Sequence, residues 1–255
     1  FGEALAEVRQ VLLREMDYVA ERNHIEVFRR LFANHPGLVI PRPVEHLCSP
    51  NVLTTEFSDG LSLQDFLFHA DSAAKEKAAT TLMSACMAAN YRHGIISGDL
   101  HPRNFLFQDG KVVWLDFGCV KQYTPDFHAT MVQMNRAYME QDQELFHRHF
   151  VALGFCRPES GLTPKETFAF FHSLKPGCLE DRPTAVTRQQ MLHVFRSFTV
   201  DNPWRNRITL PRQMVFAARL ELAMHGLATR FGAPLNWFQL HKEALYPAED
   251  IREVS

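Results

Sequence analysis

Residues 93–118 read HGIISGDLHPRNFLFQDGKVVWLDFG and combine acidic and amide residues with two β-forming runs. The first run is Phe105–Phe107 and the second is Val112–Leu115, and Asp109-Gly110 lies between them. An Asp-Gly pair between two such runs is a strong hairpin signal, because both residues accept positive φ. The sequence therefore predicts a β-hairpin at this point of the chain.

The predicted hairpin brings three polar side chains together. Asp99 and Asn104 precede its first strand and Asp116 follows its second, so we expect them to lie close to one another. Two carboxylates and an amide suit a hard cation and phosphate oxygens. They also supply a base and two metal ligands for phosphoryl transfer. The spacing Asp-x4-Asn, followed by a hairpin and Asp-Phe-Gly, is that of protein-kinase-like catalytic loops; the alternative is a surface hairpin that carries acids by chance.

The composition limits the class of protein. The chain has 255 residues, of which 46% are hydrophobic and 22% charged, enough for one large domain or two lobes. Its net charge of -2 lacks the basic excess that indicates nucleic-acid binding. Its 5 cysteines are dispersed without a Cys-x-x-Cys pair, which argues against a disulfide framework or zinc site and fits a reducing compartment.

The sequence also bears on membranes and targeting. No apolar run approaches the roughly 20 residues that span a bilayer, so we expect no transmembrane segment and a cytoplasmic or peripheral-membrane location. The chain begins at Phe1, with neither a signal peptide nor an initiating methionine, which favours an internal fragment of a longer protein.

Residues 3 to about 33 are predicted to form one helix. Apolar residues recur along it at helical spacing, and the first proline follows it at Pro36. Asp17 and Glu21 lie one turn apart on this helix and so share a face. The alternative reading of that face is a solvated acidic surface balanced by neighbouring arginines.

Two short strands and a connection to a helix are expected next. Leu38–Ile40 and Val52–Phe57 are rich in β-forming residues, and Ser58-Asp-Gly60 ends the second strand. A helix then begins near Leu61, with Ser62 and Asp65 as its capping pair. In a kinase-like fold the stretch after Phe57 is the hinge, at which backbone groups meet the adenine. The alternative is an ordinary strand-to-helix connection.

The remainder of the chain is predicted to be helical apart from the hairpin. An alanine-rich helix covers 73–91 and ends at His93-Gly94. After Gly118 we expect only helices, over 126–153 as one or two segments, 164–174 with Thr163 as its cap, 187–198 and 210–231.

These motifs resemble the UbiB/AarF/ADCK group of atypical protein-kinase-like proteins, a family linked to ubiquinone biosynthesis and lipid homeostasis. Five segments carry the resemblance in the family's order: Glu15-Met-Asp17-Tyr18 with Glu21 and Asn23, Leu47-Cys-Ser-Pro-Asn-Val-Leu-Thr-Thr-Glu56, Gly98-Asp99-Leu-His-Pro-Arg-Asn104, Leu115-Asp116-Phe-Gly118, and Leu210-Pro-Arg with Arg219 and Gly226. The first segment and the order of all five make the resemblance specific, because the third and fourth are common to kinase-like enzymes.

The resemblance implies an α+β, protein-kinase-like fold with a partial small β lobe and a mostly helical C-terminal lobe. Residues 1–57 would be the remnant of the N-lobe, with the Glu-bearing helix and two strands. Residues 58–255 would be the helical C-lobe with the catalytic-loop hairpin.

The same resemblance implies a role for each residue of the loop. Asp99 would be the catalytic Asp, and Asn104 and Asp116 would hold Mg2+ and, through it, ATP. Glu21 would pair with a nucleotide-contacting lysine.

Two further pairs of residues take roles from the resemblance. Glu56 and Phe57 would border the nucleotide at the hinge. Glu15 and Asp17 would be the E-x-D acids that meet a family-specific Lys-x-Gly-Gln segment, and that segment is thought to occlude the protein-substrate site.

The implied function is that of an atypical kinase or ATPase that binds Mg-ATP and regulates or supports ubiquinone biosynthesis. Its expected partners are the nucleotide, a lipid or quinone precursor and quinone-biosynthesis proteins. The chain lacks the nucleotide-covering loop, the Lys-bearing strand and the Lys-x-Gly-Gln segment, and Ser97 stands where kinases often have His. Whether the truncated chain turns over ATP by itself is therefore left open.

Two alternative functions remain at this point. One is a small-molecule phosphotransferase of the aminoglycoside or choline kinase type, which has a similar catalytic loop but lacks the Glu15-x-Asp17-Tyr18 signature. The other is a non-catalytic, nucleotide-binding pseudokinase scaffold. The intact Asp99, Asn104 and Asp116 argue against a fully inert site.

Overall fold

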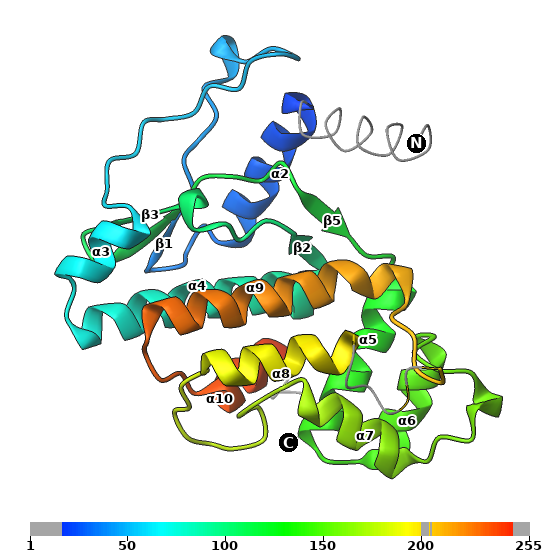
Figure 1. Cartoon of the computed structure of the whole chain (residues 1–255). Coiled ribbons are helices and arrows are strands. Elements are labelled where there is room, and N and C mark those ends of the chain that lie inside the picture. The colour runs from blue at the N-terminus through cyan, green and yellow to red at the C-terminus, as the bar shows by residue number, and fades with distance from the viewer. Residues whose placement is uncertain (1–16, 200–203, 205, 247–255) are drawn as a thin grey trace, which may run out of the picture. The chain divides into compact units, whose positions relative to one another are not determined.

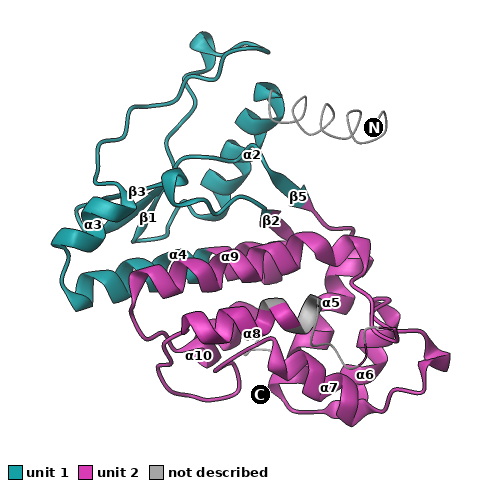
Figure 2. Cartoon of the chain, viewed as in Figure 1, with its two compact units in different colours: residues 1–85, 97–121 teal, residues 86–96, 122–255 magenta. Residues whose placement is uncertain are grey.

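A computed structural model describes residues 17–199, 204 and 206–246. The described chain divides into two compact units (Figure 2). The first unit comprises the described residues up to Ala85 together with Ser97–Lys121, and the second comprises Cys86–Ile96 together with the described residues from Gln122 onward. The predicted boundary at residue 57 does not coincide with this division, because the hairpin lies in the same unit as the residues that precede it.

A three-stranded sheet lies in the first unit, in the order β1-β4-β3 (Figure 1). β1 (Leu38–Val39) runs parallel to β4 (Lys111–Trp114), and β4 pairs antiparallel with β3 (Phe105–Gln108). The turn between β3 and β4 has positive φ at both central residues, 51° at Asp109 and 71° at Gly110. The predicted hairpin is thus confirmed, for the reason expected from its Asp-Gly pair.

The helices of the first unit are α2 (Tyr18–Leu31), α3 (Leu63–His69) and the first part of α4 (Ser72–His93). α3 has the predicted cap, in which the Ser62 side chain accepts the Asp65 N–H. A short 3-10 helix, η1 (Glu45–Leu47), lies in the loop after β1. The chain continues between the units through α4, β2 (Ile95–Ser97) and β5 (Val120–Gln122).

An aromatic cluster forms the core of the first unit. Phe28 of α2 lies 4.8 Å from the ring of Phe117 and 5.4 Å from that of Trp114, measured between centroids. Phe105 of β3 packs on Trp114 at 5.6 Å, and all four side chains are at most 1% exposed. Each buried aromatic side chain contributes roughly 1.5–3 kcal/mol by leaving water. The cluster therefore fixes α2 against the hairpin and the segment that follows it.

Two predicted elements of the first unit differ from the structure. Asp17 lies within the helix predicted over residues 3–33 but is not helical, because it has φ -84° and ψ 77° and caps α2 by accepting the Ala20 N–H at 3.0 Å. The part of that prediction before Asp17 lies outside the described residues. The strand predicted at Val52–Phe57 is wrong: the segment forms only isolated bridges, such as that between Pro43 and Thr55. Two backbone bonds flank the Pro43 bridge, but the ladder stops there, because the Thr54 N–H donates to Cys48 Sγ and the Arg42 N–H donates to the Glu56 carboxylate.

The second unit is helical. α5 (Pro125–Met139) packs against α6 (Gln143–Ala152) and α10 (Trp237–Leu245), α6 packs against α7 (Pro164–Ser173), and α8 (Arg188–Thr199) packs against α9 (Val215–Phe231). The 3-10 helices η3 (Pro158–Ser160) and η4 (Arg212–Met214) precede α7 and α9. In the described residues we find no helix that is both long and apolar enough to span a bilayer.

The predicted helices of this unit are largely confirmed. Thr163 caps α7 in a reciprocal capping box with Glu166. Residues 126–153 form two helices rather than one, because Gln141 has a φ of 59° and Asp142 caps α6. The expectation of helices only after Gly118 missed the short strand β5, and α10 was not predicted at all.

Candidate functional site

The loop before the hairpin holds Asn104 against Asp99. The 3-10 helix η2 (Pro102–Asn104) is capped by His101, whose Nδ1 accepts the Arg103 N–H at 3.2 Å. This turn directs the Asn104 side chain back along the chain, where its Nδ2 donates to Asp99 Oδ2 at 3.1 Å and to the Asp99 carbonyl at 3.2 Å. Because the amide nitrogen makes both bonds, the amide oxygen of Asn104 remains available to a cation.

The two ends of the hairpin are joined directly. The N–H of Leu115 donates to the carbonyl of Asn104 at 2.9 Å, which brings the start of the Asp116 segment to the loop that carries Asp99 and Asn104. The N–H of Gly118 donates to Asp116 Oδ1 at 2.9 Å and orients that carboxylate. The structure therefore gathers Asp99, Asn104 and Asp116 in the first unit, as their positions around the hairpin predicted.

Helix α2 holds the peptide groups of Phe117 on both sides. Glu21 Oε1 accepts the Phe117 N–H at 3.3 Å, and His24 Nδ1 donates to the Phe117 carbonyl at 3.1 Å. The sequence predicted Glu21 as a site residue, but His24 was not predicted. The spacing of three residues on one helix could have identified it, because such residues share a face.

The pKa of the Glu21 carboxyl is raised by its surroundings. Burial raises the pKa of its carboxyl, the nearby Asp116 carboxylate raises it further, and the hydrogen bond from the Phe117 N–H lowers it. A carboxyl whose pKa is raised by a neighbouring carboxylate is typical of a site that receives a cation.

The donor set fits magnesium. Asp116 and Asn104 supply a carboxylate and an amide oxygen, and Mg2+ commonly binds through one or two such ligands plus phosphate oxygens and water. No group of three or more His, Cys, Asp or Glu in the described part of the chain is arranged to hold a metal ion by itself. A metal at this position would therefore depend on phosphate or water oxygens as further ligands.

The other residues predicted for the site occupy different settings. Glu56 forms an exposed ion pair with Arg42 at 2.8 Å, and hydrogen bonds from Arg42 lower the pKa of its carboxyl. Phe57 is 92% exposed. Both border a hollow of about 460 Å³ in the first unit, together with Val113 of β4. Their nucleotide contacts remain predictions.

Only the second acid of the E-x-D signature lies among the described residues. Asp17 is engaged in capping α2, and Glu15 lies outside the described residues.

Comparisons with known proteins agree with these motifs. The family model described as the ABC1 atypical kinase-like domain matches residues 1–150. The chain is 29% identical over 160 residues to Protein ACTIVITY OF BC1 COMPLEX KINASE 1, chloroplastic, of Arabidopsis thaliana, and 26% identical over 144 residues to Atypical kinase COQ8B, mitochondrial, of Rattus norvegicus. These alignments cover 62% and 56% of this chain but 24% and 27% of the relatives, so the chain spans about a quarter of their length.

A solved structure shares the fold. The structure of Rv3197 from Mycobacterium tuberculosis in complex with erythromycin superposes with a TM-score of 0.77 over 97% of this chain and 62% of the other, at 20% identity. At that identity the likeness concerns the fold alone. The chain therefore belongs to the ABC1 atypical kinase-like family, the UbiB group that its motifs resemble, and has a kinase-like α+β fold.

Proposed function

We propose that this chain binds a magnesium nucleotide at Asp99, Asn104 and Asp116 and carries the catalytic loop of a phosphotransferase or ATPase. The observation that carries the proposal is the hydrogen bond from Asn104 to Asp99, combined with the backbone bond that joins Asn104 to the Asp116 segment. These contacts hold Asn104 against Asp99 and bring the segment that carries Asp116 to the same loop before any ligand binds, and such preorganisation supports a role in phosphoryl transfer.

Each side chain has a separate task in this proposal. The amide oxygen of Asn104 and the carboxylate of Asp116 would hold the magnesium ion. The ion neutralises charge on the phosphates during transfer. Asp99 would orient the attacking hydroxyl or water and accept its proton, while the Asn104 Nδ2 keeps the Asp99 carboxylate in place.

Glu21 would connect the magnesium site to the nucleotide-contacting lysine that the family resemblance implies. Its carboxyl lies under the influence of the Asp116 carboxylate, so a cation bound at Asp116 would lower the pKa of Glu21 and favour its ionised form. An ionised Glu21 suits the lysine partner that the family resemblance implies. That lysine is not part of the described chain, and the whole protein's activity depends on it.

The family resemblance supports a role in ubiquinone, or isoprenoid-lipid, biosynthesis. We infer a lipid or quinone precursor, or a protein of quinone synthesis, as the partner of the complete protein. A peripheral-membrane or cytoplasmic location fits such a partner. ATP hydrolysis that is coupled to handling of the lipid and direct phosphorylation are both compatible with the catalytic loop.

Nucleotide binding can be tested on this chain by thermal unfolding with and without Mg-ATP. We expect Mg-ATP to raise the melting temperature, and Asp116→Asn to abolish that rise because the variant loses an anionic metal ligand. Asp126→Asn is the matched control: it makes the same change at an exposed aspartate of the second unit that does not line the hollow beside Glu56 and Phe57. An equal rise in wild type and Asp116→Asn would refute the assignment.

Catalysis is a separate test on the full-length protein. Asp99→Asn should retain the Mg-ATP-dependent rise in melting temperature but lose nucleotide turnover, because Asp99 acts on the acceptor rather than on the metal. Full turnover in Asp99→Asn would remove Asp99 from the mechanism without affecting the binding proposal.

A further inference from the structure

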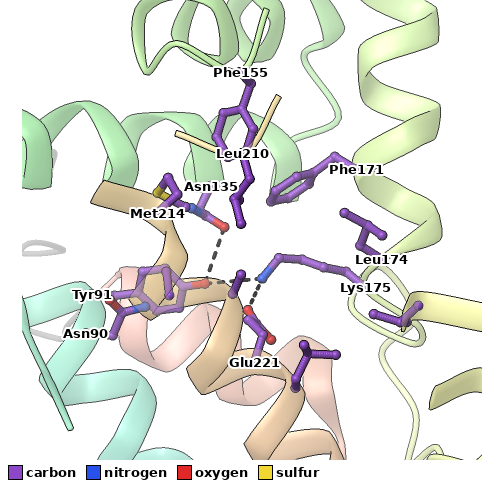
Figure 3. A pocket seen from close by; sticks show the side chains of 14 residues that line it. Asn90, Tyr91, Asn135, Phe155, Phe171, Leu174, Lys175, Leu210, Met214 and Glu221 are labelled. Atoms are coloured by element: carbon purple, nitrogen blue, oxygen red, sulfur yellow. Dashed lines mark hydrogen bonds and ion pairs between the residues drawn. The ribbon is translucent and has the colours of Figure 1, made fainter. Parts of the chain in front are cut away.

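The second unit contains a cavity of about 60 Å³ that is separate from the nucleotide proposal. It lies among the end of α4, α5, α7, α8 and α9, and most of its lining residues follow the segment matched by the family model (Figure 3). A single buried water needs roughly 10–15 Å³ by a comparable measure. The cavity can therefore hold a molecule of several heavy atoms.

The walls of the cavity are largely apolar. They are formed by the side chains of Phe155, Phe171, Leu174, Leu210, Met214 and Leu222, with two alanines of α9 between them. An apolar cavity with a few convergent polar groups is the usual form of a small-molecule site.

A buried ion pair forms the polar end of the cavity. Lys175 pairs with Glu221 Oε1, donates to the Tyr91 hydroxyl at 3.3 Å and lies 3.4 Å from His241 Nε2. Figure 3 shows the Lys175 side chain extending toward Glu221 and Tyr91. These three contacts use the donors of the ammonium group, which also lies 5.3 Å from the ring centroid of Phe171.

Both members of the pair are charged. Burial acts to raise the pKa of Glu221, but Lys175, through its charge and its hydrogen bond, together with His225 and His241 outweighs it and holds the value at about 2. Burial acts to lower the pKa of Lys175, but Glu221 together with Tyr91 and Cys178 raises it well above the usual value. The pair is therefore neutral as a whole, and a charged ligand beside it would bring an unbalanced charge into an apolar site.

Spare hydrogen-bond acceptors lie at this end of the cavity. The second carboxylate oxygen of Glu221 has no hydrogen-bond partner within the part of the chain that the structure describes. Asn90 also lines the cavity, and its buried Oδ1 has no partner among those residues. The Tyr91 hydroxyl, by contrast, already donates to Asn135 Oδ1 at 3.4 Å.

We propose that this cavity binds a small uncharged molecule with an apolar body and one hydroxyl, which donates its hydrogen bond to the free oxygen of Glu221. The apolar walls take the body of the molecule, and the carboxylate takes the hydroxyl without disturbing the bond to Lys175. This site is independent of the nucleotide site, because all its residues belong to the second unit.

The probe for this proposal is 1-butanol, compared with its isomer diethyl ether. The two molecules have the same atoms, but only the alcohol donates a hydrogen bond. With ¹³C-methyl methionine labelling, the Met214 resonance reports on the cavity it lines, and Met83, fully buried in the first unit, serves as the internal reference. We expect a saturable Met214 shift with 1-butanol and roughly tenfold weaker binding of the ether, as a hydrogen bond to a charged group implies.

A pair of variants tests the location. Ala218 lines the cavity, so Ala218→Leu should fill it and weaken 1-butanol binding at least tenfold. Ala223 lies on the same helix but does not line the cavity, so Ala223→Leu should leave the affinity within about twofold of wild type. Both variants retain the ion pair, and thermal unfolding checks that both are folded.

Three outcomes would overturn the proposal. Equal affinities for the alcohol and the ether would show that no hydroxyl is recognised. Undiminished binding to Ala218→Leu would place the ligand elsewhere. A Met214 resonance that does not saturate up to the solubility of 1-butanol would mean that the cavity holds water only.

Discussion

The ion pair between Lys175 and Glu221 should respond unequally to loss of its two partners. The side chain of Lys175 is 6% exposed, whereas that of Glu221 is 25% exposed. In Glu221→Gln the ammonium remains buried without an anion. In Lys175→Met the remaining carboxylate can be hydrated through its exposed part. We therefore expect Glu221→Gln to be the more destabilising change.

The magnitudes follow from this difference in exposure. Removal of one partner of a buried ion pair costs roughly 3–5 kcal/mol, and Glu221→Gln should fall in that range. For Lys175→Met the cost should be nearer 1–3 kcal/mol, because the unpaired group regains part of its hydration. The double variant should be less destabilised than Glu221→Gln alone, because it leaves no unpaired charge.

Urea unfolding followed by tryptophan fluorescence at pH 7 measures these free energies. The control is Glu180→Gln, which breaks the exposed pair with Arg182, whose side chains are 52% and 72% exposed; its unfolding curve should overlap that of wild type. The reasoning is refuted if Lys175→Met destabilises as much as Glu221→Gln, or if the two effects simply add in the double variant.

Three further predictions concern stability. Burial and the neighbouring Lys175 ammonium lower the pKa of His241 to about 4, whereas the unfolded imidazole protonates near 6.5. The free energy of unfolding should therefore fall by up to about 3 kcal/mol as the pH drops from about 6.5 to about 4. Denaturant titrations across this pH range should show a flatter profile for His241→Asn. Gly110→Ala should cost about 1 kcal/mol in thermal unfolding because φ is 71° there, and a melting temperature equal to wild type would contradict this. Thr163→Ala should cost about 1 kcal/mol by removing the α7 cap, while an unchanged urea midpoint would show that the cap is dispensable.

The features predicted correctly from the sequence are those encoded locally. The Asp109-Gly110 turn specifies the hairpin through two adjacent residues, and the hairpin then brings Asn104 and Asp116 together. The caps at Ser62 and Thr163 likewise depend on side chains three residues apart. Such contacts carry their own signal, because the interacting residues lie within one turn of the chain.

The features that were missed depend on distant residues. The hydrogen bond between His24 and Phe117 joins positions 93 residues apart, and that between Lys175 and Tyr91 joins positions 84 residues apart. The helical spacing from Glu21 places His24 on the same face, but no local pattern specifies that His24 meets Phe117 or that Lys175 meets Tyr91. The strand predicted at Val52–Phe57 failed for a related reason, because β propensity does not encode that the Thr54 N–H donates to Cys48 Sγ and the Arg42 N–H to the Glu56 carboxylate instead of continuing a ladder.

The two hydrogen bonds between α2 and the backbone of Phe117 limit how the sequence of α2 can change during evolution. Glu21 and His24 reach the N–H and the carbonyl of one residue from a single helical face. An insertion of one residue between them would rotate one contact by about 100° around the helix axis and separate the pair. The amino acids between Glu21 and His24 can therefore vary among relatives, whereas their number should not.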